Sequence, residues 1–460
     1  MLNKAAFLQK LREVSPIRLI VGSFLAIILV GALLLILPFS SRDGGFTSPL
    51  DAFFTATSAT CVTGLVVFDT WSKWSAFGQA VILMMIQLGG LGLLSFTTGF
   101  TLLLRRKLGL RDLQLAKEYT SGNVMDAPRL IRTILAWTFG CEAAGALLLM
   151  CRFVPEFGGY GVWVAVFTSV SAYCNAGFDI LGFKGPFVNL IPYAKDPLVS
   201  LTVAFLIIIG GIGFLVVSDI HICYLRKKRE GERHPRLTLH SKIVLWMTGI
   251  LLAVGTILFF VMEYGGVLRG MNFFEKLNVS FFQSAAARTA GFATVDIASM
   301  HDITKLMSVI LMFIGASPSS TGGGIKTTTF VVLAATVWSV LRGHEDTVVF
   351  KRRIEKQAIY KSLAIVAVGL LLVLLTTTVI LLAEGDGVSA IDALYEATSA
   401  FGTVGLSAGL TPELSVFSKL ALSFTMFVGR VGPVSLAFAV SMRHSGRGGT
   451  ILPEGKVIVG

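Results

Sequence analysis

Charged residues are scarce in this chain of 460 residues, where Asp, Glu, Lys and Arg together make up 14%. Ordinary globular domains carry about 25%. Hydrophobic residues make up 54%, and the mean hydropathy is +0.77. Apolar runs such as 19–37, 243–261 and 363–382 have about the length, ~20 residues, that crosses a bilayer as a helix. The shortage of charge therefore excludes a soluble globular protein and predicts an integral protein of the lipid membrane.

Cysteine and histidine are also scarce, and neither is arranged for chemistry. The five cysteines are Cys61, Cys141, Cys151, Cys174 and Cys223, and none has the spacing of a disulfide framework or a zinc site. The six histidines are scattered, and no Ser/His/Asp or phosphoacceptor constellation shares one membrane depth. The sequence therefore predicts that the protein is not an enzyme and binds no metal other than a monovalent cation.

The charge that is present is positive and localised. The net charge is +12, and 27 of the 39 lysines and arginines lie in five segments. These segments are 1–18, 105–132, 226–242, 342–361 and 442–460. Because basic loops stay on the cytoplasmic side of a membrane, this pattern predicts a multi-pass protein with both termini in the cytoplasm. The basic character then reflects topology, and no nucleic-acid partner is expected.

Four short glycine-bearing stretches recur along the chain: TCVTGL at 60–65, YCNAGF at 173–178, ARTAGF at 287–292 and FGTVGL at 401–406. Their glycines, Gly64, Gly177, Gly291 and Gly405, are 113, 114 and 114 residues apart. An aromatic residue precedes each by ten positions (Phe54, Phe167, Phe281, Tyr395), and a serine by six or seven (Ser58, Ser171, Ser284, Ser399). Self-similarity at a fixed period indicates a repeat architecture.

Each quarter contains an outer apolar helix, a short segment, a glycine-bearing loop and an inner apolar helix, which in the second quarter is expected over 198–225. The short segments, 49–60, 162–173, 273–287 and 390–400, cannot span a bilayer, so we expect them to be re-entrant. The predicted fold is an all-α membrane protein with eight transmembrane helices, arranged as four helix–pore loop–helix repeats with pseudo-fourfold symmetry around one central pore. The predicted parts are a cytoplasmic segment 1–16, repeats 17–110, 129–228, 240–343 and 358–442, and a cytoplasmic tail 443–460.

The glycine-bearing loops have the composition of a cation filter. Glycine permits backbone torsions that turn successive carbonyl oxygens inward, and potassium filters consist of four such carbonyl strands. The predicted filter residues are Val62, Thr63, Gly64, Asn175, Ala176, Gly177, Thr289, Ala290, Gly291, Thr403, Val404 and Gly405. One such loop alone could equally be a helix-ending turn, but four at this spacing favour a filter.

A second motif lies in the inner helices, where GGLG, GGIG, GASP and GRVG begin at Gly89, Gly210, Gly315 and Gly429. Arg430 stands where the other quarters have Gly90, Gly211 and Ala316. Arginine within a membrane span usually faces a watery cavity, so Arg430 is predicted to form an electrostatic barrier in the pore. The alternative is that a neighbouring helix neutralises Arg430 through Glu142.

The third quarter continues its motif with a stretch that breaks the inner helix, because proline and consecutive glycines disfavour helix. We predict that this stretch is a gate: Gly315, Ala316, Ser317, Pro318, Ser319, Ser320, Thr321, Gly322, Gly323, Gly324, Ile325 and Lys326. The string GGGIKTTT lacks the GxxxxGK[ST] spacing and the preceding strand of a phosphate-binding loop. Nucleotide binding by this chain is therefore not expected.

With these loops, the GRVGP arginine and the broken third inner helix, the chain resembles the Trk/Ktr/HKT superfamily of potassium transporters over essentially its whole length. It is most similar to the ion-translocating membrane subunit of bacterial Ktr systems, because only about sixteen residues precede the first repeat and the chain ends in PEGKVIVG. Gly64, Gly177, Gly291 and Gly405 match the filter glycines of the family, with glycine in the first loop as in potassium-selective members. Residues 315–329 match the intramembrane gating loop, and Arg430 matches the inner-helix arginine.

The resemblance also implies partners. Members form homodimers in the bacterial inner (plasma) membrane on a cytosolic ring of regulatory subunits. These regulatory subunits, and not the membrane chain, bind ATP or ADP. Segments 226–242 and 342–361 would be available for that contact. The expected function is selective K⁺ uptake through a channel-like pore gated by the loop and the regulatory subunit, with dependence on Na⁺ left open. The alternative is an alternating-access carrier for a small solute, which would need a pocket between discontinuous helices.

Overall fold

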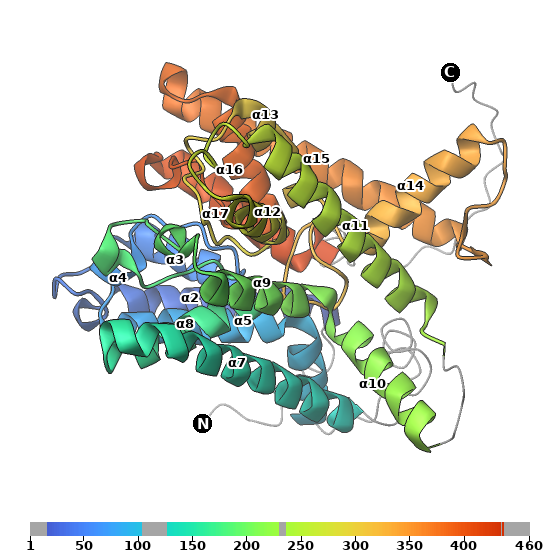
Figure 1. The fold of residues 1–460 in the computed structure, drawn as a ribbon, viewed down its shortest axis with the longest axis horizontal. Helices are drawn as coiled ribbons and strands as arrows, with labels where there is room; N and C mark the ends of the chain where they lie inside the picture. The colour runs from blue at the N-terminus through green and yellow to red at the C-terminus, as the bar shows by residue number, and fades with distance from the viewer. Residues whose placement is uncertain (1–15, 104–126, 230–235, 434, 437–460) are drawn as a thin grey trace, which may run out of the picture.

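The computed structural model describes residues 16–103, 127–229, 236–433, 435 and 436 (Figure 1). Most of the predicted segment 1–16 and all of the tail 443–460 lie outside the described residues. Within them, the same three-part plan occurs four times: a long outer helix, a short helix and an inner helix. The outer helices are α2 (Pro16–Ile36), α7 (Ala127–Phe157), α11 (Leu239–Met262) and α15 (Lys356–Glu384).

The short and inner helices complete each repeat. The short helices are α3 (Pro49–Thr60), α8 (Tyr160–Tyr173), α12 (Phe273–Ala286) and α16 (Ala390–Gly402). The inner helices are α5 (Ala76–Leu103), α9 (Pro197–Ile212) with α10 (Phe214–Arg229), α13 (Asp302–Phe313) with α14 (Thr327–Leu341), and α17 (Val416–Val431). The connecting turns are α4 (Thr70–Lys73), η1 (Pro38–Ser40), η3 (Gly182–Lys184), η4 (Ile191–Tyr193), η5 (Gly385–Gly387) and η6 (Thr411–Glu413).

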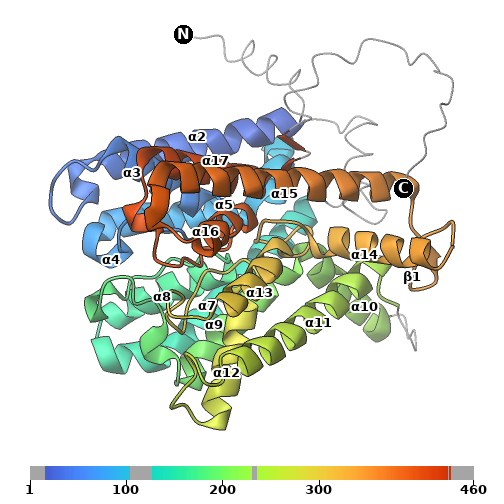
Figure 2. The same ribbon diagram turned by 90° about the horizontal axis from the view of Figure 1, so that it is seen from above.

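A short two-stranded antiparallel hairpin adds to the all-α fold without changing its class. Strands β1 (Val348–Val349) and β2 (Arg352–Arg353) pair with Val348 opposite Arg353. The hairpin lies between the third and fourth repeats, beside α14. Figure 2 shows α4 at one end of the helix bundle and α14 with β1 at the opposite end, an arrangement that also holds in Figure 1. We call these the α4 end and the α14 end.

The longest helices are long and apolar enough to span a membrane. By length and composition, three stretches of the described chain can cross a bilayer, namely Thr133–Phe157, Leu239–Met262 and Lys356–Glu384. The bent pair Pro197–Ile212 and Phe214–Tyr224 makes a fourth if it counts as one span. Shorter apolar helices occur at Ile20–Ile36, Ala76–Gly92, Tyr160–Tyr173 and Thr327–Leu341. Much of this apolar surface is exposed, as expected for helices that face lipid.

Three of the inner helices break at one common register, the fourth residue of the glycine motif. Gly92 has φ 48° and ψ −158° inside α5, Gly213 has φ 96° between α9 and α10, and Gly432 has φ 91° at the end of α17. The expectation of a continuous second inner helix over 198–225 is therefore wrong, because α9 and α10 meet at 88°. The third inner helix is interrupted as predicted, between Phe313 and Thr327.

The four repeats form a closed ring of neighbours. The inner helix of each repeat packs against the short helix of the next: α5 on α8, α9 on α12, α13 on α16, and α17 on α3. Glycine allows a close approach within each repeat as well. A Cβ on Gly89, Gly210 or Gly429 would lie 2.0 Å from the carbonyl oxygen of Thr60, Tyr173 or Phe401 at the end of its short helix. These contacts place the ends of the short helices in the centre of the ring.

Candidate functional site: the ring of four loops

The four predicted loops meet in cyclic order. A Cβ on Gly64 would lie 2.4 Å from Ala176 O, and one on Gly177 would lie 2.8 Å from Ala290 O. A Cβ on Gly291 would lie 2.4 Å from Val404 O, and one on Gly405 would lie 2.1 Å from Thr63 O, which closes the circle. We call residues 62–64, 175–177, 289–291 and 403–405 the loop ring. All twelve are buried, and the structure brings together every residue that was predicted for this site.

The backbone of the loop ring is strained in the same way four times. The first residue of each triplet has positive φ: Val62 56°, Asn175 60°, Thr289 72° and Thr403 49°. The glycine of each triplet also has positive φ, from 69° to 96°. Left-handed torsions in β-branched residues are rare and cost roughly 1–3 kcal/mol each. Strain of this kind, repeated at one place in four segments, clusters at functional sites.

The torsions turn the N–H groups toward the short helices and leave the carbonyls free. The N–H groups of Thr63, Ala176 and Val404 donate to Ser58 O, Ser171 O and Ser399 O at 2.8, 2.7 and 2.8 Å, and Ala290 N donates to Ala286 O at 3.0 Å. By contrast, within the described part of the chain no hydrogen bond ends on a carbonyl oxygen of the loop ring. Buried carbonyls almost always have a partner, so the ring offers twelve oxygens to a ligand.

The recurrent serines support the loops, except in the third repeat. Gly64 N donates to Ser58 Oγ at 3.1 Å, and Gly405 N donates to Ser399 Oγ at 3.0 Å. Ser171 Oγ instead donates to Phe178 O, the residue after the loop ring, at 2.7 Å. Ser284, seven residues before its glycine, points the other way and donates to Leu252 O in α11 at 3.0 Å. The sequence showed the spacing of these serines but not their partners.

The electrostatics of the loop ring favour a cation. None of the twelve residues is charged, so the field comes from dipoles. The ring lies directly after the C-terminal ends of α3, α8, α12 and α16, which carry partial negative charge. Carbonyl oxygens supply the remaining negative potential. A cation could exchange its water shell for these oxygens without any proton transfer.

The 315–326 loop lies against the loop ring on the side of α10. Ser317 N donates to Gly211 O at 3.1 Å, and Phe214 N donates to Ser319 O at 2.9 Å, so the first half of the loop is tied to the second repeat. Gly323 N donates to Thr403 Oγ1 in the fourth repeat at 2.9 Å. The loop thus contacts other repeats directly across the centre of the molecule.

Arg430 reaches this loop from the fourth inner helix. Its buried guanidinium donates to Thr321 O of the 315–326 loop and to Gly89 O of the first inner helix. No ion pair joins Arg430 to a carboxylate of the described residues, so the alternative that Glu142 neutralises it is wrong. Glu142 lies instead beside Cys174, whose Sγ is 3.8 Å from Glu142 Oε1. Lys326, half-buried, donates to Gly322 O at 2.7 Å within the loop.

Sequence reasoning missed a set of contacts that join neighbouring repeats. Two are ion pairs: Lys419–Asp51 at 3.0 Å and Lys305–Asp392 at 2.8 Å. The other two interfaces use neutral groups at the same level, Asn278 Nδ2 to Ser200 Oγ at 2.7 Å and Trp163 Nε1 to Gln79 Oε1 at 2.9 Å. A signal existed: the inner-helix members, Gln79, Ser200, Lys305 and Lys419, all stand ten residues before Gly89, Gly210, Gly315 and Gly429.

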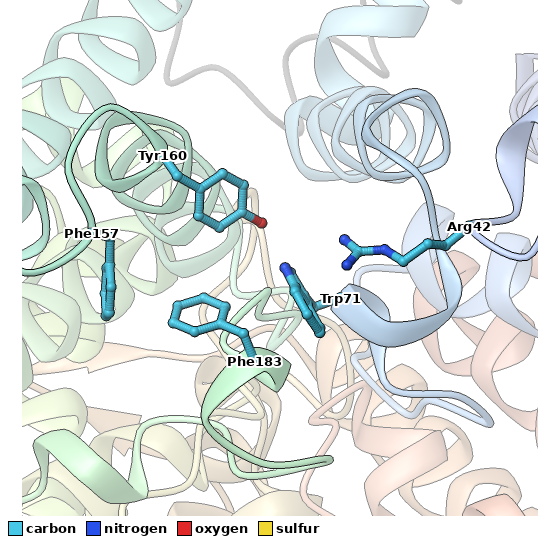
Figure 3. A pocket seen from close by; sticks show the side chains of 5 residues that line it. All are labelled: Arg42, Trp71, Phe157, Tyr160 and Phe183. Carbon is cyan, nitrogen blue, oxygen red and sulfur yellow. The ribbon is translucent and has the colours of Figure 1, made fainter.

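A surface pocket of about 430 Å³ lies apart from the loop ring, near the α4 end (Figure 3). It is lined by Arg42, Trp71, Phe157, Tyr160 and Phe183. The Arg42 guanidinium stacks 3.9 Å from the Trp71 ring centroid, and the ring centroids of Phe157 and Phe183 are 4.8 Å apart. This is an aromatic cluster between the first two repeats, and none of its residues belongs to the predicted site.

The comparisons with known proteins agree with this architecture. The family model described as TrkH, cation transport protein, matches residues 10–447. The chain belongs to the TrkH family of cation transport proteins. Membership in a transporter family confirms the predicted resemblance and the prediction that the protein is not an enzyme. It also makes this chain a multi-pass membrane transporter, as the sequence predicted.

Relatives of this TrkH-family chain match it along nearly its whole length. The Ktr system potassium uptake protein B of Bacillus subtilis (strain 168) is 38% identical and covers 100% of both chains. The protein of the same name from Vibrio alginolyticus is 39% identical over 92% of this chain and 91% of its own. The potassium/sodium uptake protein NtpJ of Enterococcus hirae is 36% identical over 94% of each.

A solved structure shares the fold. The crystal structure of the potassium transporter TrkH from Vibrio parahaemolyticus has a TM-score of 0.69, covering 92% of this chain and 85% of that one, at 16% identity. The likeness confirms an all-helical membrane fold of the TrkH type.

Proposed function

We propose that this chain is the membrane subunit of a potassium uptake system and that the loop ring is its selectivity filter. The observation that carries the proposal is the set of twelve buried carbonyl oxygens that accept no hydrogen bond from the described residues. Four converging carbonyl strands are the arrangement that replaces the hydration shell of K⁺. The names of the relatives, potassium uptake and potassium/sodium uptake proteins, support K⁺ as the transported ion.

The proposed topology places eight spans around the loop ring, two from each repeat. The four short helices are re-entrant, because non-helical backbone at membrane depth must line a cavity or lie within protein. The basic segment that includes Arg342, Arg352 and Arg353 lies at the α14 end. By the positive-inside rule that end faces the cytoplasm of a bacterial inner membrane, with both termini on the same side, and the α4 end faces outward.

The 315–326 loop is the proposed gate, and Arg430 its electrostatic support. The loop lies against the cytoplasmic side of the loop ring, and Arg430 holds it through Thr321 O. A guanidinium beside the ion path also opposes cation passage while the loop is closed. We further propose a homodimer on a cytosolic ring of nucleotide-binding regulatory subunits, supported by the names of the Ktr system relatives. The transport assay measures K⁺ flux with and without Na⁺ and so distinguishes coupling from modulation.

The test is potassium uptake by cells without their own uptake systems, followed by K⁺ and Na⁺ flux in liposomes. Gly64→Ser and Gly291→Ser are expected to reduce discrimination against Na⁺, because each Cβ would lie 2.4 Å from the carbonyl oxygen of the next loop. Gly249→Ser is the matched control, since a Cβ there meets nothing within 4 Å. Unchanged selectivity in both loop variants would refute the filter assignment. Solute flux independent of monovalent cations would instead favour the carrier alternative.

A further inference from the structure

We infer that Thr403 and Thr289 are positioning residues that latch the 315–326 loop onto the third and fourth strands of the loop ring. The loop therefore opens only when this latch breaks. The inference rests on the proposed function of the loop as a gate, and it adds which residues set the closed position. It starts from the contacts of two glycines in the middle of the loop.

Gly322 and Gly323 lie directly against the two threonine hydroxyls. A Cβ on Gly322 would lie 2.0 Å from Thr289 Oγ1, and a Cβ on Gly323 would lie 2.3 Å from Thr403 Oγ1. Side chains at these positions would therefore push the loop away from the ring. The absence of a side chain allows Gly323 N to donate to Thr403 Oγ1 at 2.9 Å. The glycine triplet thus interrupts the helix and also lets the loop approach the two threonines closely.

The two threonines hold the strained first position of their loop-ring strands. Thr289 has φ 72° and Thr403 has φ 49°, and both are buried. Their carbonyl oxygens belong to the proposed filter, so one residue presents its carbonyl to the ion and its hydroxyl to the loop. In the first and second repeats the equivalent residues are Val62 and Asn175. The Asn175 amide lies 3.2 Å from Thr289 Oγ1, which links the second strand to the same latch.

The rest of the loop is held elsewhere, which makes these contacts the adjustable ones. The first half is tied to the second repeat through Ser317 N and Ser319 O, and Arg430 holds Thr321 O. The last residues pair with the end of α13 through a parallel bridge between Ile314 and Ile325. Between these anchors, the hydrogen bond from Gly323 N is the only one in the described chain that joins a loop N–H to a loop-ring residue.

Loss of the hydroxyl should favour the open loop. In Thr403→Val the Gly323 N–H would be buried without an acceptor in the closed loop, whereas an open loop could expose it to water. An unsatisfied buried donor shifts such an equilibrium by on the order of tenfold. The Thr403→Ser variant keeps the acceptor. We expect K⁺ flux into liposomes, without any regulatory subunit, to rise about tenfold in Thr403→Val and to rise less in Thr403→Ser, because the serine hydroxyl can still accept the Gly323 N–H.

A cycle with a loop deletion separates the latch from the gate. In a variant that lacks 322–324, flux should be high, and Thr403→Val should add nothing to it. If the deletion raises flux but Thr403→Val does not, the latch is refuted and the gate stands. If the deletion does not raise flux in protein that elutes as the parent does on size exclusion, the gate itself is refuted.

Gly323→Ala tests the latch from the other side if Thr403→Val fails to fold. Its Cβ would press on Thr403 Oγ1, while Thr403 itself remains intact. Gly387→Ala is the matched control, because a Cβ there meets nothing within 4 Å. Raised flux in Gly323→Ala but not in Gly387→Ala supports the latch. Equal flux in the two variants overturns it.

Discussion

The serines behind the loop ring give a sharp test, because the chain contains its own control. Ser58 Oγ accepts the Gly64 N–H at 3.1 Å, whereas Ser284 Oγ turns away and donates to the backbone of α11. Both serines are buried and both lie near the C-terminal end of a short helix. Removal of either hydroxyl deletes one buried hydrogen bond. Only removal of the Ser58 hydroxyl deletes a bond to a residue of the loop ring.

The magnitude follows from the bond that is lost. Ser58→Ala leaves the Gly64 N–H buried without an acceptor, which costs roughly 1–3 kcal/mol. Since about 1.4 kcal/mol is a factor of ten, the native position of Gly64 becomes roughly 5 to 150 times less favoured. The Thr63 N–H keeps its bond to Ser58 O, so the loop should shift rather than unfold. We expect the K⁺/Na⁺ flux ratio to fall by about tenfold.

The assay is K⁺ and Na⁺ influx into liposomes at matched protein incorporation, with Ser58→Thr as a variant that keeps an acceptor. Ser399→Ala should behave like Ser58→Ala, because Ser399 Oγ accepts the Gly405 N–H in the same way. Ser284→Ala should change the flux ratio by less than about twofold, since its bond does not reach the loop ring. Equal losses of selectivity in Ser58→Ala and Ser284→Ala would refute the reasoning.

Two further predictions concern stability. Lys305 and Asp392 form a pair with side chains 6% and 21% exposed, so either single alanine variant leaves a charge unpaired and should lower the melting temperature in detergent more than the double variant does. If the loss of melting temperature in the double variant equals the sum of the losses in the two single variants, the two charges are not coupled. For Glu263, burial raises the pKa, but hydrogen bonds, including those from the backbone N–H groups of His301 and Val267, outweigh it and hold the pKa below its ordinary value. Its stabilising contribution is therefore complete above the ordinary pKa of about 4.3 and is lost as the pH falls through the lower folded value. In a plot of melting temperature against pH, Glu263→Gln should therefore flatten the acid side. An unchanged plot would show that the Glu263 carboxylate does not contribute to stability.

The repeat could be predicted from the sequence because local chemistry produces it. The short segment 49–60 coincides with α3, and the other three short helices begin and end within two residues of the predicted segments. A fixed spacing between a serine, a glycine and an aromatic residue requires four copies of one turn, whatever surrounds them. The meeting of these turns in one ring follows because non-helical backbone inside a membrane must be shared by the repeats.

Partners that are distant in sequence could not be predicted in the same way. Gly323 and Thr403 are 80 residues apart, and Lys419 and Asp51 are 368 apart. Glu142 seemed suited to neutralise Arg430, yet membrane depth alone does not fix the direction of a side chain around its helix. The second inner helix was expected to be continuous because its apolar run does not stop at Gly213. There the glycine adopts φ 96°, and the bend brings the start of α10 to Ser319 of the 315–326 loop.

The breaks in the other inner helices show that the third repeat does not differ from them by having an interrupted inner helix. Three inner helices lose helical geometry at the same register, at Gly92, Gly213 and Gly432, and the third ends slightly earlier, at Phe313, so interruption by itself is a property of the whole ring. The third repeat differs in the length of its interruption, which spans the residues from Ile314 to Lys326. That length lets the backbone cross the centre, where it contacts Gly211, Thr403 and Arg430 from other repeats. Of the three inter-repeat ion pairs among the described residues, the two shorter ones involve the fourth repeat, through Asp392 at 2.8 Å and Lys419 at 3.0 Å, and the longer one, Lys195–Glu275 at 4.0 Å, joins the second and third repeats. Charged pairs hold the fourth repeat to its neighbours on either side. In the proposed gate, the fourth repeat would therefore be the fixed element against which the loop of the third repeat moves.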